Sequence, residues 1–425
     1  MTVRRRLRWM WVQIGLLVAV MGPGVITSNV DNDAGGIYTY SLCGARYGYS
    51  LLWLLLPVTV SLVIVQEMCS RMGAVTGKGL ADLIREEFGL RVTFLVMMAV
   101  LFTNVGNAVA EFAGLASGLE VFGISRYVSV PLGAIFVWWL VVFGTYKSLE
   151  KVFLIACLFY LAYPLSGFLS EPDWEAAIRG TLVPRVETDL AGLSMVVGVV
   201  GTTIAPWMQF YLQSAVVEKE VEISQYGKLR LDVVMGSIMA AGVAFFIVVA
   251  CAATLHAKGV TSIASAAEAA QALAPLAGRY ASVLFAFGLA NASLFAASIL
   301  PLATAYSVCE GLGLEAGVNK KFGEAPEFYG LYTAIIALGA GTILVPGAPL
   351  LKIILYSQIL NGVLLPFILF FMVVLVNRER IMGRFINGTV YNVVTWATMV
   401  ILVGLSAALT ATSFLPGSDG LRGSP

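Results

Sequence analysis

The chain has 425 residues, of which 59% are hydrophobic and 12% are charged, and its mean hydropathy is +0.87. A soluble domain carries about 25% charged residues, so this composition excludes an ordinary soluble enzyme and is typical of a polytopic membrane protein. The net charge of +1 gives no reason to expect a nucleic-acid partner. The five cysteines are scattered singly, which predicts neither a disulfide framework nor a metal-thiolate site.

Apolar segments of about 20 residues, the length needed to cross a bilayer, recur along the whole chain. About eleven candidates follow one another, at residues 11–41, 50–72, 93–122, 128–145, 151–169, 190–216, 231–255, 280–312, 328–345, 350–376 and 390–415. If the N-terminus is cytoplasmic, eighteen of the 26 Lys and Arg residues fall inside and the other eight outside. This bias follows the positive-inside rule. It predicts a multi-pass protein of the plasma membrane with a cytoplasmic N-terminus.

The first segment is interrupted by polar residues. Within residues 22–36, an apolar stretch is followed by Asp31, Asn32 and Asp33 and then by a glycine pair. A carboxylate at mid-membrane depth costs at least a few kcal/mol, so it indicates function, and two close together require a cation. The glycines disfavour a continuous helix and free carbonyls to face a ligand. The alternative is a solvent-exposed loop between two short helices.

The sixth segment is interrupted at the corresponding place in the second half, at residues 201–207. Pro206 removes a helix hydrogen bond there and clashes with the preceding turn. Paired interruptions in two halves predict an inverted-repeat transporter with its site at the midplane. We therefore expect one transmembrane domain over residues 1–425. Its parts are a first repeat at about 11–170, a second at about 190–376 and an extra span at about 390–415.

Polar side chains also occur within two other spans. Asn104, Asn107 and Glu111 recur at i, i+3 and i+7 and form one helix face that must look into protein or water. The alternative for Glu111 is a structural carboxylate paired with a hydroxyl group or an arginine. Gln358 places an amide in the tenth span, where a ligand role and an interhelical hydrogen bond remain open.

Glu67 precedes Arg71 by four residues near the cytoplasmic end of the second span. This spacing predicts an ion pair on one helix face. A structural or gating role fits the pair better than a ligand role.

Several stretches resemble the Nramp (SLC11-like) family of divalent-metal transporters. Residues 22–24 and 44–53 resemble its first-span region, and residues 71–80 resemble its loop after the second span. Residues 357–358 and 381–387 resemble its tenth span and the turn that follows. The similarity runs across nearly the whole chain. It implies an all-α protein with the LeuT-type 5+5 inverted repeat, unwound first and sixth spans and eleven transmembrane helices.

The departures from the family pattern concern its metal ligands. Typical members have Asp-Pro-Gly-Asn where residues 33–36 read Asp-Ala-Gly-Gly, and Met-Pro-His where residues 205–207 read Ala-Pro-Trp. The later family histidine falls on Gln213. The third-span glutamate is retained as Glu111, whereas the acid three residues earlier is Ala108. This pattern resembles the Nramp-related magnesium transporters.

The same substitutions favour a hard cation on chemical grounds. A thioether suits transition metals, whereas carboxylate, amide and carbonyl oxygens suit Mg²⁺ or Ca²⁺. Ala205 also enlarges the pocket, and Mg²⁺ dehydrates reluctantly, so a wide oxygen-lined cavity can accept it partly hydrated. Met208, three residues on, is the one sulfur that could point into the site.

We therefore expect a secondary transporter that imports partly hydrated Mg²⁺ by alternating access without proton coupling. It is expected to be a monomer in the lipid bilayer, neither an enzyme nor a cofactor protein, with Mn²⁺ as a second candidate cargo. The alternatives are a proton-coupled Mn²⁺/Fe²⁺ importer of the Nramp type, a sodium-coupled amino-acid carrier and an intramembrane hydrolase. The expected metal-site residues are Asp31, Asp33, Glu111, Thr202, Ala205 and Gln358, of which Thr202 and Ala205 are expected to offer backbone carbonyls. A second group of expected site residues comprises Asn32, Gly36, Asn104, Asn107, Trp207 and Met208.

Overall fold

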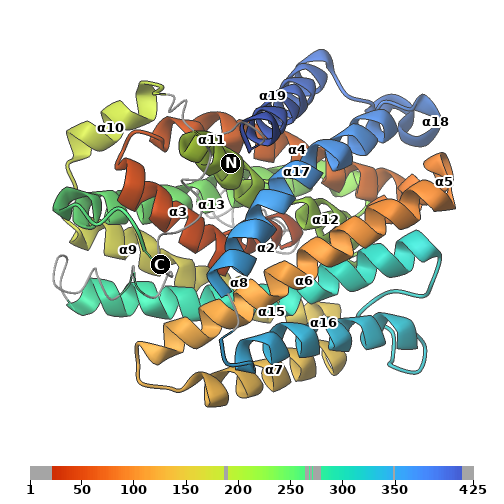
Figure 1. Cartoon of the computed structure of the whole chain (residues 1–425). Helices are drawn as coiled ribbons and strands as arrows, with labels where there is room; N and C mark the ends of the chain where they lie inside the picture. Colours follow the sequence, from red (N-terminus) through yellow and green to blue (C-terminus); the bar gives the residue numbers. More distant parts are fainter. Residues whose placement is uncertain are drawn as a thin grey trace, which may run out of the picture.

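The computed structural model describes residues 22–185, 190–263, 268, 270, 279–347 and 350–413, and the regular structure in these residues is helical (Figure 1). The α-helices in chain order are α2 (Pro23–Val30), α3 (Ala34–Tyr47), α4 (Leu55–Thr76), α5 (Leu80–Phe88), α6 (Leu90–Glu120), α7 (Arg126–Val142), α8 (Tyr146–Leu158), α9 (Ala162–Leu169), α10 (Trp174–Leu182), α11 (Leu190–Thr203), α12 (Pro206–Glu218), α13 (Tyr226–Thr254), α15 (Arg279–Leu312), α16 (Pro326–Leu344), α17 (Leu350–Val376), α18 (Glu379–Met382) and α19 (Thr389–Ser413). Short 3-10 helices are η1 (Leu52–Leu54), η2 (Phe159–Leu161), η3 (Ile223–Gln225), η4 (His256–Lys258) and η5 (Gly383–Phe385).

Eight helical stretches in the described part of the chain are long and apolar enough to cross a membrane, and two shorter apolar helices accompany them. The helices begin and end within a few residues of the expected segments. The part of the first expected span that precedes Gly22 lies outside the described residues. The total of eleven spans stays a prediction.

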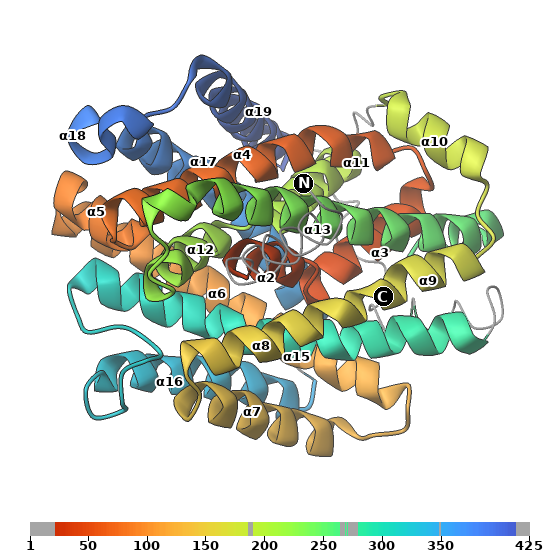
Figure 2. The ribbon, with the colours of Figure 1, turned by 180° about the vertical axis from the view of Figure 1, so that it is seen from behind.

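Glycines set how closely the central helices approach one another. A Cβ at Gly24 of α2 would lie 2.7 Å from the backbone nitrogen of Val233 on α13, and one at Gly236 would lie 2.6 Å from the Gly24 carbonyl oxygen. Gly201 of α11 meets Gly362 of α17 in the same way, at 2.6 Å from its nitrogen. Small residues at such crossings let backbones pack in contact where no hydrophobic effect drives association. The two broken helices are therefore held against α13 and α17 (Figure 2).

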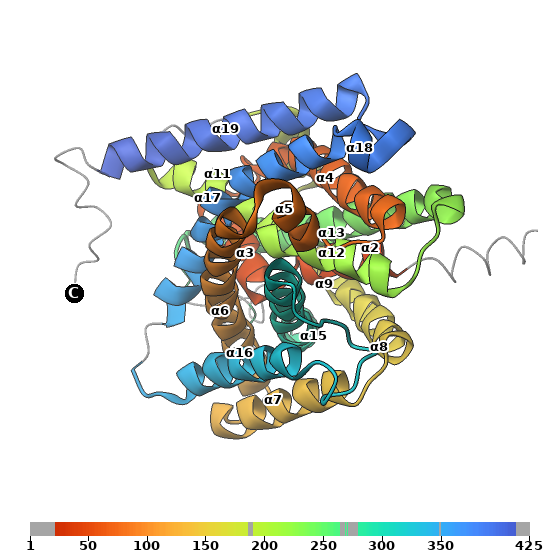
Figure 3. The ribbon, with the colours of Figure 1, turned by 90° about the vertical axis from the view of Figure 1, so that its right-hand side faces the viewer.

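Two short helices mark opposite ends of the bundle, with α5 at one end and α10 at the other (Figure 1). We call these the α5 end and the α10 end. Neither helix was expected from the sequence. The α10 helix begins because the Asp173 side chain accepts from the Ala176 N–H at 3.0 Å. The α5 helix lies against the bundle end in Figure 3 and buries Leu80, Leu83 and Ile84.

A carboxylate from another helix caps the start of α2. Asp232 of α13 accepts hydrogen bonds from the backbone N–H groups of Gly22, Gly24 and Val25 at 3.1, 2.7 and 3.2 Å. These are the groups that a helix N-terminus leaves without intrahelical partners. The interaction fixes α2, and with it the break that follows α2, to α13.

The expected ion pair is confirmed at the α5 end. Arg71 and Glu67 are 3.2 Å apart and both are buried. Arg71 also donates to the carbonyl oxygen of Phe385 at 2.6 Å and to the side chain of Asn387 at 2.5 Å, while Tyr226 donates to Glu67. The pair thus joins α4, the start of α13 and the α18–α19 connection.

Candidate cation site

The first break lies where the sequence predicts it, between α2 and α3. Asp33 occupies the N-cap position of α3, where its Oδ1 accepts from the Gly36 N–H at 2.6 Å. Glu111 reaches the same helix end from α6, and its Oε2 accepts from the Ala34 N–H at 3.1 Å. A helix N-terminus favours negative charge. The N–H groups at the start of α3 therefore hold the carboxylates of Asp33 and Glu111 at the same helix end.

The second break is also confirmed, between α11, which ends at Thr203, and α12, which begins at Pro206. Because Pro206 has no N–H, the Thr202 carbonyl loses its usual helical partner. The Thr203 hydroxyl is 2.7 Å from the hydroxyl group of Tyr40 on α3, which ties the two broken helices together. Both breaks therefore belong to one local structure.

The Ala205 carbonyl is already engaged in this conformation. It accepts from the Met208 N–H and from the Gln209 side-chain amide, both at 3.2 Å. Thr202 is the better placed of the two expected sixth-span ligands, because its hydroxyl oxygen is buried without a partner.

Oxygens from the two breaks converge beside Gly36. A Cβ at this position would lie 2.7 Å from the Asp31 carbonyl oxygen, 3.2 Å from Thr202 Oγ1 and 3.4 Å from Asp33 Oδ1. No side chain can be added at Gly36 without displacing one of these oxygens. The glycine that replaces the family's ligating asparagine therefore sits where three oxygens already meet.

The surroundings of the breaks contain an excess of hydrogen-bond acceptors. The expected carboxylates and Thr202 are at most 4% exposed. Five oxygens there are buried without a hydrogen-bond partner, namely Asn29 Oδ1, Asp31 Oδ1, Asn32 Oδ1, Glu111 Oε1 and Thr202 Oγ1. A buried acceptor left unpaired costs about 1–3 kcal/mol, and more when it is charged. A cation bound among these acceptors, with part of its water shell, would give them a partner.

Gln358 faces the first break from α17. Its Nε2 is buried without a partner and lies against Gly35, where a Cβ would collide with it. Its Oε1 accepts from the Asn361 amide at 3.3 Å. In this orientation Gln358 offers a donor to the site. A half-turn of the amide would present the oxygen as a ligand instead.

The expected polar face of α6 is confirmed as a network of amides. Asn107 and Asn361 exchange hydrogen bonds of 3.4 and 3.3 Å, and Asn107 also donates to Asn104 at 3.4 Å. Asn104 donates in turn to Thr304 of α15 at 2.9 Å. This chain of side chains leads from Gln358 toward the α5 end.

The other residues of the second expected group lie around the site in different roles. Asn32 donates to the Ala240 carbonyl of α13 at 3.1 Å, so its amide nitrogen anchors the break. Trp207 is 1% exposed, and Met208 is fully buried in the first turn of α12. No three carboxylate, imidazole or thiol side chains in the described ranges gather closely enough to hold an ion by themselves. An ion at the breaks would therefore take amide, hydroxyl, carbonyl or water oxygens as well.

Three residues that support the site were missed from the sequence. Asn29 supplies one of the unpartnered oxygens, Tyr40 bridges the breaks, and Asp232 caps α2. Asp232 could have been noticed as a carboxylate in an apolar span, where it signals a buried partner. Tyr40 carries no such signal, because a tyrosine in a span is ordinary.

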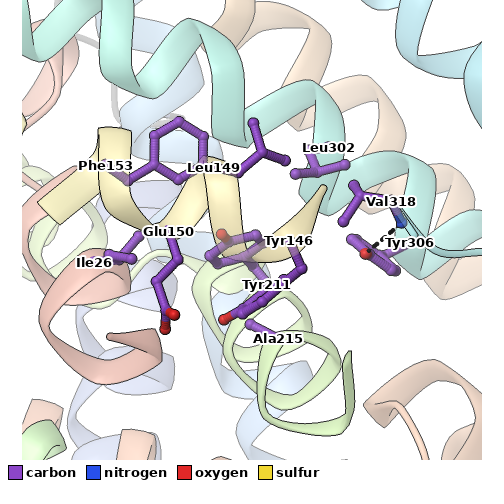
Figure 4. Close-up of a pocket in the computed structure, with 10 residues that line it drawn as sticks. All are labelled: Ile26, Tyr146, Leu149, Glu150, Phe153, Tyr211, Ala215, Leu302, Tyr306 and Val318. Atoms are coloured by element: carbon purple, nitrogen blue, oxygen red, sulfur yellow. Dashed lines mark hydrogen bonds between the residues drawn. The ribbon is translucent and has the colours of Figure 1, made fainter. Parts of the chain in front are cut away.

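A small cavity is lined by residues from α2, α8, α12 and α15 and by Val318 (Figure 4). Its volume of about 10 Å³ suits at most one water molecule. Tyr146, Tyr211 and Tyr306 fill the space around it, and Glu150 beside it pairs with Lys219 at 2.5 Å. Aromatic side chains thus pack between these four helices.

The comparisons with known proteins agree with this architecture. The family model of Natural resistance-associated macrophage protein-like proteins (Nramp) matches residues 24–412. The divalent metal cation transporter MntH of Deinococcus radiodurans is 25% identical over 404 residues, covering 92% of this chain and 89% of the relative. The divalent metal cation transporter MntH of Yersinia pestis is 27% identical over 401 residues, covering 92% of this chain and 94% of the relative.

Solved structures share the fold. The Eremococcus coleocola manganese transporter, in complex with an aromatic bis-isothiourea substituted compound, superposes with a TM-score of 0.76 at 20% identity, covering 96% of this chain and 89% of that one. Mhp1, a nucleobase-cation-symport-1 family transporter in a closed conformation, superposes with a TM-score of 0.58 at 12% identity. The match covers 92% of this chain and 93% of that one. The LeuT-type helical fold expected from the sequence is confirmed. The chain belongs to the Nramp family.

Proposed function

We propose that this protein carries divalent cations across the plasma membrane by alternating access, and that its cargo is Mg²⁺. The relatives named above are described as divalent metal cation or manganese transporters, which supports the general class. One observation supports the narrower assignment. The second break carries Ala205, which has no sulfur, and five buried carboxylate, amide and hydroxyl oxygens at the two breaks lack a hydrogen-bond partner.

Oxygen ligands favour a hard cation, and Mg²⁺ in particular keeps several waters when it binds. Asp31, Asp33 and Glu111 supply the negative charge in this proposal, and Thr202 supplies a hydroxyl oxygen. Ala205 stands where typical family members have a methionine, whose thioether would displace water from a softer metal ion and bind it. The absence of a side chain at Gly36 lets the oxygens of Asp31, Thr202 and Asp33 approach one another.

The same arrangement argues against an amino-acid carrier. Carriers of this architecture bind a substrate carboxylate with the free N–H groups of a broken helix. Here the first N–H groups of α3 are taken by Asp33 and Glu111. A second anion would meet these carboxylates instead of free donors.

Transport is proposed to need no proton coupling. The only histidine of the sequence, His256, lies in η4 and its Nδ1 is 3.0 Å from the Ala45 carbonyl oxygen, away from both breaks. An inside-negative potential contributes about 2.3 kcal/mol per charge per 100 mV, or about 4.6 kcal/mol for a dication, which suffices for accumulation. The charge bias of the connections supports a cytoplasmic N-terminus and α5 end.

Proteoliposomes test this proposal directly. Vesicles that contain a Mg²⁺ indicator and a pH dye are given an inside-negative potential and external Mg²⁺. We expect Mg²⁺ uptake that scales with the potential and leaves internal pH unchanged, and no uptake by D33N. Acidification that accompanies uptake would contradict the uncoupled mechanism.

A proton-coupled Mn²⁺ importer is the second candidate, because the named relatives include manganese transporters. The A205M variant separates the two. A site that already binds soft metals gains little from a new thioether. An oxygen-only site gains affinity for Mn²⁺ and Cd²⁺ and loses some for Mg²⁺.

A further inference from the structure

A carboxylate at the α5 end has no role in the site described above. Glu310 lies in the last turns of α15, where its Oε1 accepts from the Ser214 hydroxyl at 2.7 Å. Its Oε2 is buried without a hydrogen-bond partner. A buried ionised oxygen with no partner is costly unless a cation reaches it.

The neighbouring basic side chains do not neutralise this carboxylate. Arg85 donates to the backbone carbonyl of Glu310 at 2.8 Å and to the carboxylate of Asp82 at 2.9 Å. The Lys78 ammonium is bound to Glu86 at 2.7 Å. Within the described ranges, Glu310 forms no ion pair.

A second unpartnered oxygen lies beside the same loop. Gln213 of α12 is fully buried, donates through Nε2 to the Lys78 carbonyl at 2.8 Å, and leaves Oε1 without a partner. Gly79, which follows Lys78, lies so close to Glu310 that a Cβ on Gly79 would collide with the carboxylate. Gln213 and Glu310 thus meet residues 78–79 from two different helices, and each presents an unpaired oxygen.

Polar side chains connect this place with the breaks. From Glu111, the α6 face continues through Asn107 to Asn104, about 10 Å along the helix axis. Asn104 donates to Thr304 on α15, which precedes Glu310 by six residues, or about 9 Å. These residues are buried within apolar spans. A line of buried polar side chains therefore joins the breaks to the α5 end.

We propose that Glu310 and Gln213 form a second, transient binding site for the transported divalent cation on its way out at the cytoplasmic end. The inference rests on the function proposed above. Its rival is a purely structural contact, in which the Ser214–Glu310 hydrogen bond fastens α12 to α15. The cation site and the structural contact differ in what they require of Glu310. A cation site needs the negative charge of Glu310, whereas a structural hydrogen bond needs only its acceptor oxygen.

Two substitutions separate these requirements. E310Q keeps an oxygen that can accept from Ser214 but removes the charge. S214A keeps the charge but removes the hydrogen bond. E327Q is the matched control, because Glu327 is an exposed carboxylate near the same end of the bundle, at the start of α16.

The assay is the initial rate of Mg²⁺ uptake into proteoliposomes, measured with and without Mg²⁺ already inside. We expect E310Q to slow uptake by about tenfold or more, to leave the external KM within about twofold, and to raise the internal Mg²⁺ concentration that halves the rate. S214A is expected to stay within about threefold of the wild type, and E327Q to match it. E310D should recover part of the lost rate, because it restores the charge.

The outcomes distinguish this inference from the function on which it rests. If S214A is as slow as E310Q, or if E310Q transports at the wild-type rate while D33N is inactive, the second site is refuted and the proposed function stands. If D33N transports Mg²⁺ as well as the wild type, or the wild type transports none, the proposed function fails and the second site fails with it.

Discussion

Asp33 performs two tasks that substitution can separate. Its Oδ1 caps α3 through the Gly36 N–H at 2.6 Å. The same oxygen lies beside the Asp31 carbonyl and the Thr202 hydroxyl, at 3.4 Å from where a Cβ of residue 36 would be. Asparagine keeps an oxygen at that position and caps a helix about as well as aspartate. Alanine removes the oxygen altogether. D33N should therefore lose the charge alone, whereas D33A should lose both the charge and the cap.

The expected magnitudes differ for binding and for stability. At about 4 Å, with one water between ion and carboxylate, two unit charges interact by about 4 kcal/mol at an effective dielectric constant near 20, and a dication by about 8 kcal/mol. Desolvation opposes most of this attraction. If a quarter survives, about 2 kcal/mol, D33N weakens Mg²⁺ binding about thirtyfold. Loss of the cap in D33A should cost a further ~1 kcal/mol of stability.

Isothermal calorimetry of the purified protein measures the Mg²⁺ dissociation constant, and thermal melting in detergent without Mg²⁺ follows stability. D33N should melt close to the wild type, and D33A should melt lower. The reasoning is refuted if D33N binds Mg²⁺ with wild-type affinity, or if the two variants lose the same stability.

Three further outcomes are expected. A205M should raise the affinity for Cd²⁺, measured by calorimetry, by about tenfold or more, because it adds a soft ligand. An unchanged affinity would mean that the site already contains a sulfur. D232A should destabilise the protein by about 3 kcal/mol, because three N–H groups at the start of α2 lose their acceptor, and D232N should destabilise it by less. Equal melting temperatures for D232A and the wild type would show that the cap does not contribute to stability. G36A should lose most uptake, because its Cβ would lie 2.7 Å from the Asp31 carbonyl oxygen and push apart the three oxygens that meet there. Uptake at the wild-type rate would place the ion elsewhere.

The sequence was sufficient to predict the membrane spans and both breaks, because their causes are local. Apolar runs report the spans, and Pro206 and the glycine pair report where a helix cannot continue. The ion pair of Glu67 with Arg71 was predictable for the same reason, since i,i+4 spacing fixes it within one helix. The short α5 and α10 helices were missed, because their length and mixed polarity resemble those of ordinary connections.

The partners of the site residues could not be predicted, because they depend on how distant helices pack. Nothing local to Asp33 says that Glu111, 78 residues away, caps the same helix end. Nor does the sequence say that the Ala205 carbonyl is engaged while the Thr202 hydroxyl is free. Residue types indicated the ligand chemistry, and only the packed structure indicates which oxygens have no other partner.

The central claim is that the cargo is bound by oxygen ligands alone. Calorimetric titration of the wild-type protein with Mg²⁺ and with Cd²⁺, under the same conditions, tests it most directly. The account predicts saturable Mg²⁺ binding that D33N weakens about thirtyfold, and no preference for Cd²⁺. Tight Cd²⁺ binding with no heat from Mg²⁺ would contradict it, because such a ranking requires a sulfur ligand, with Met208 the first candidate.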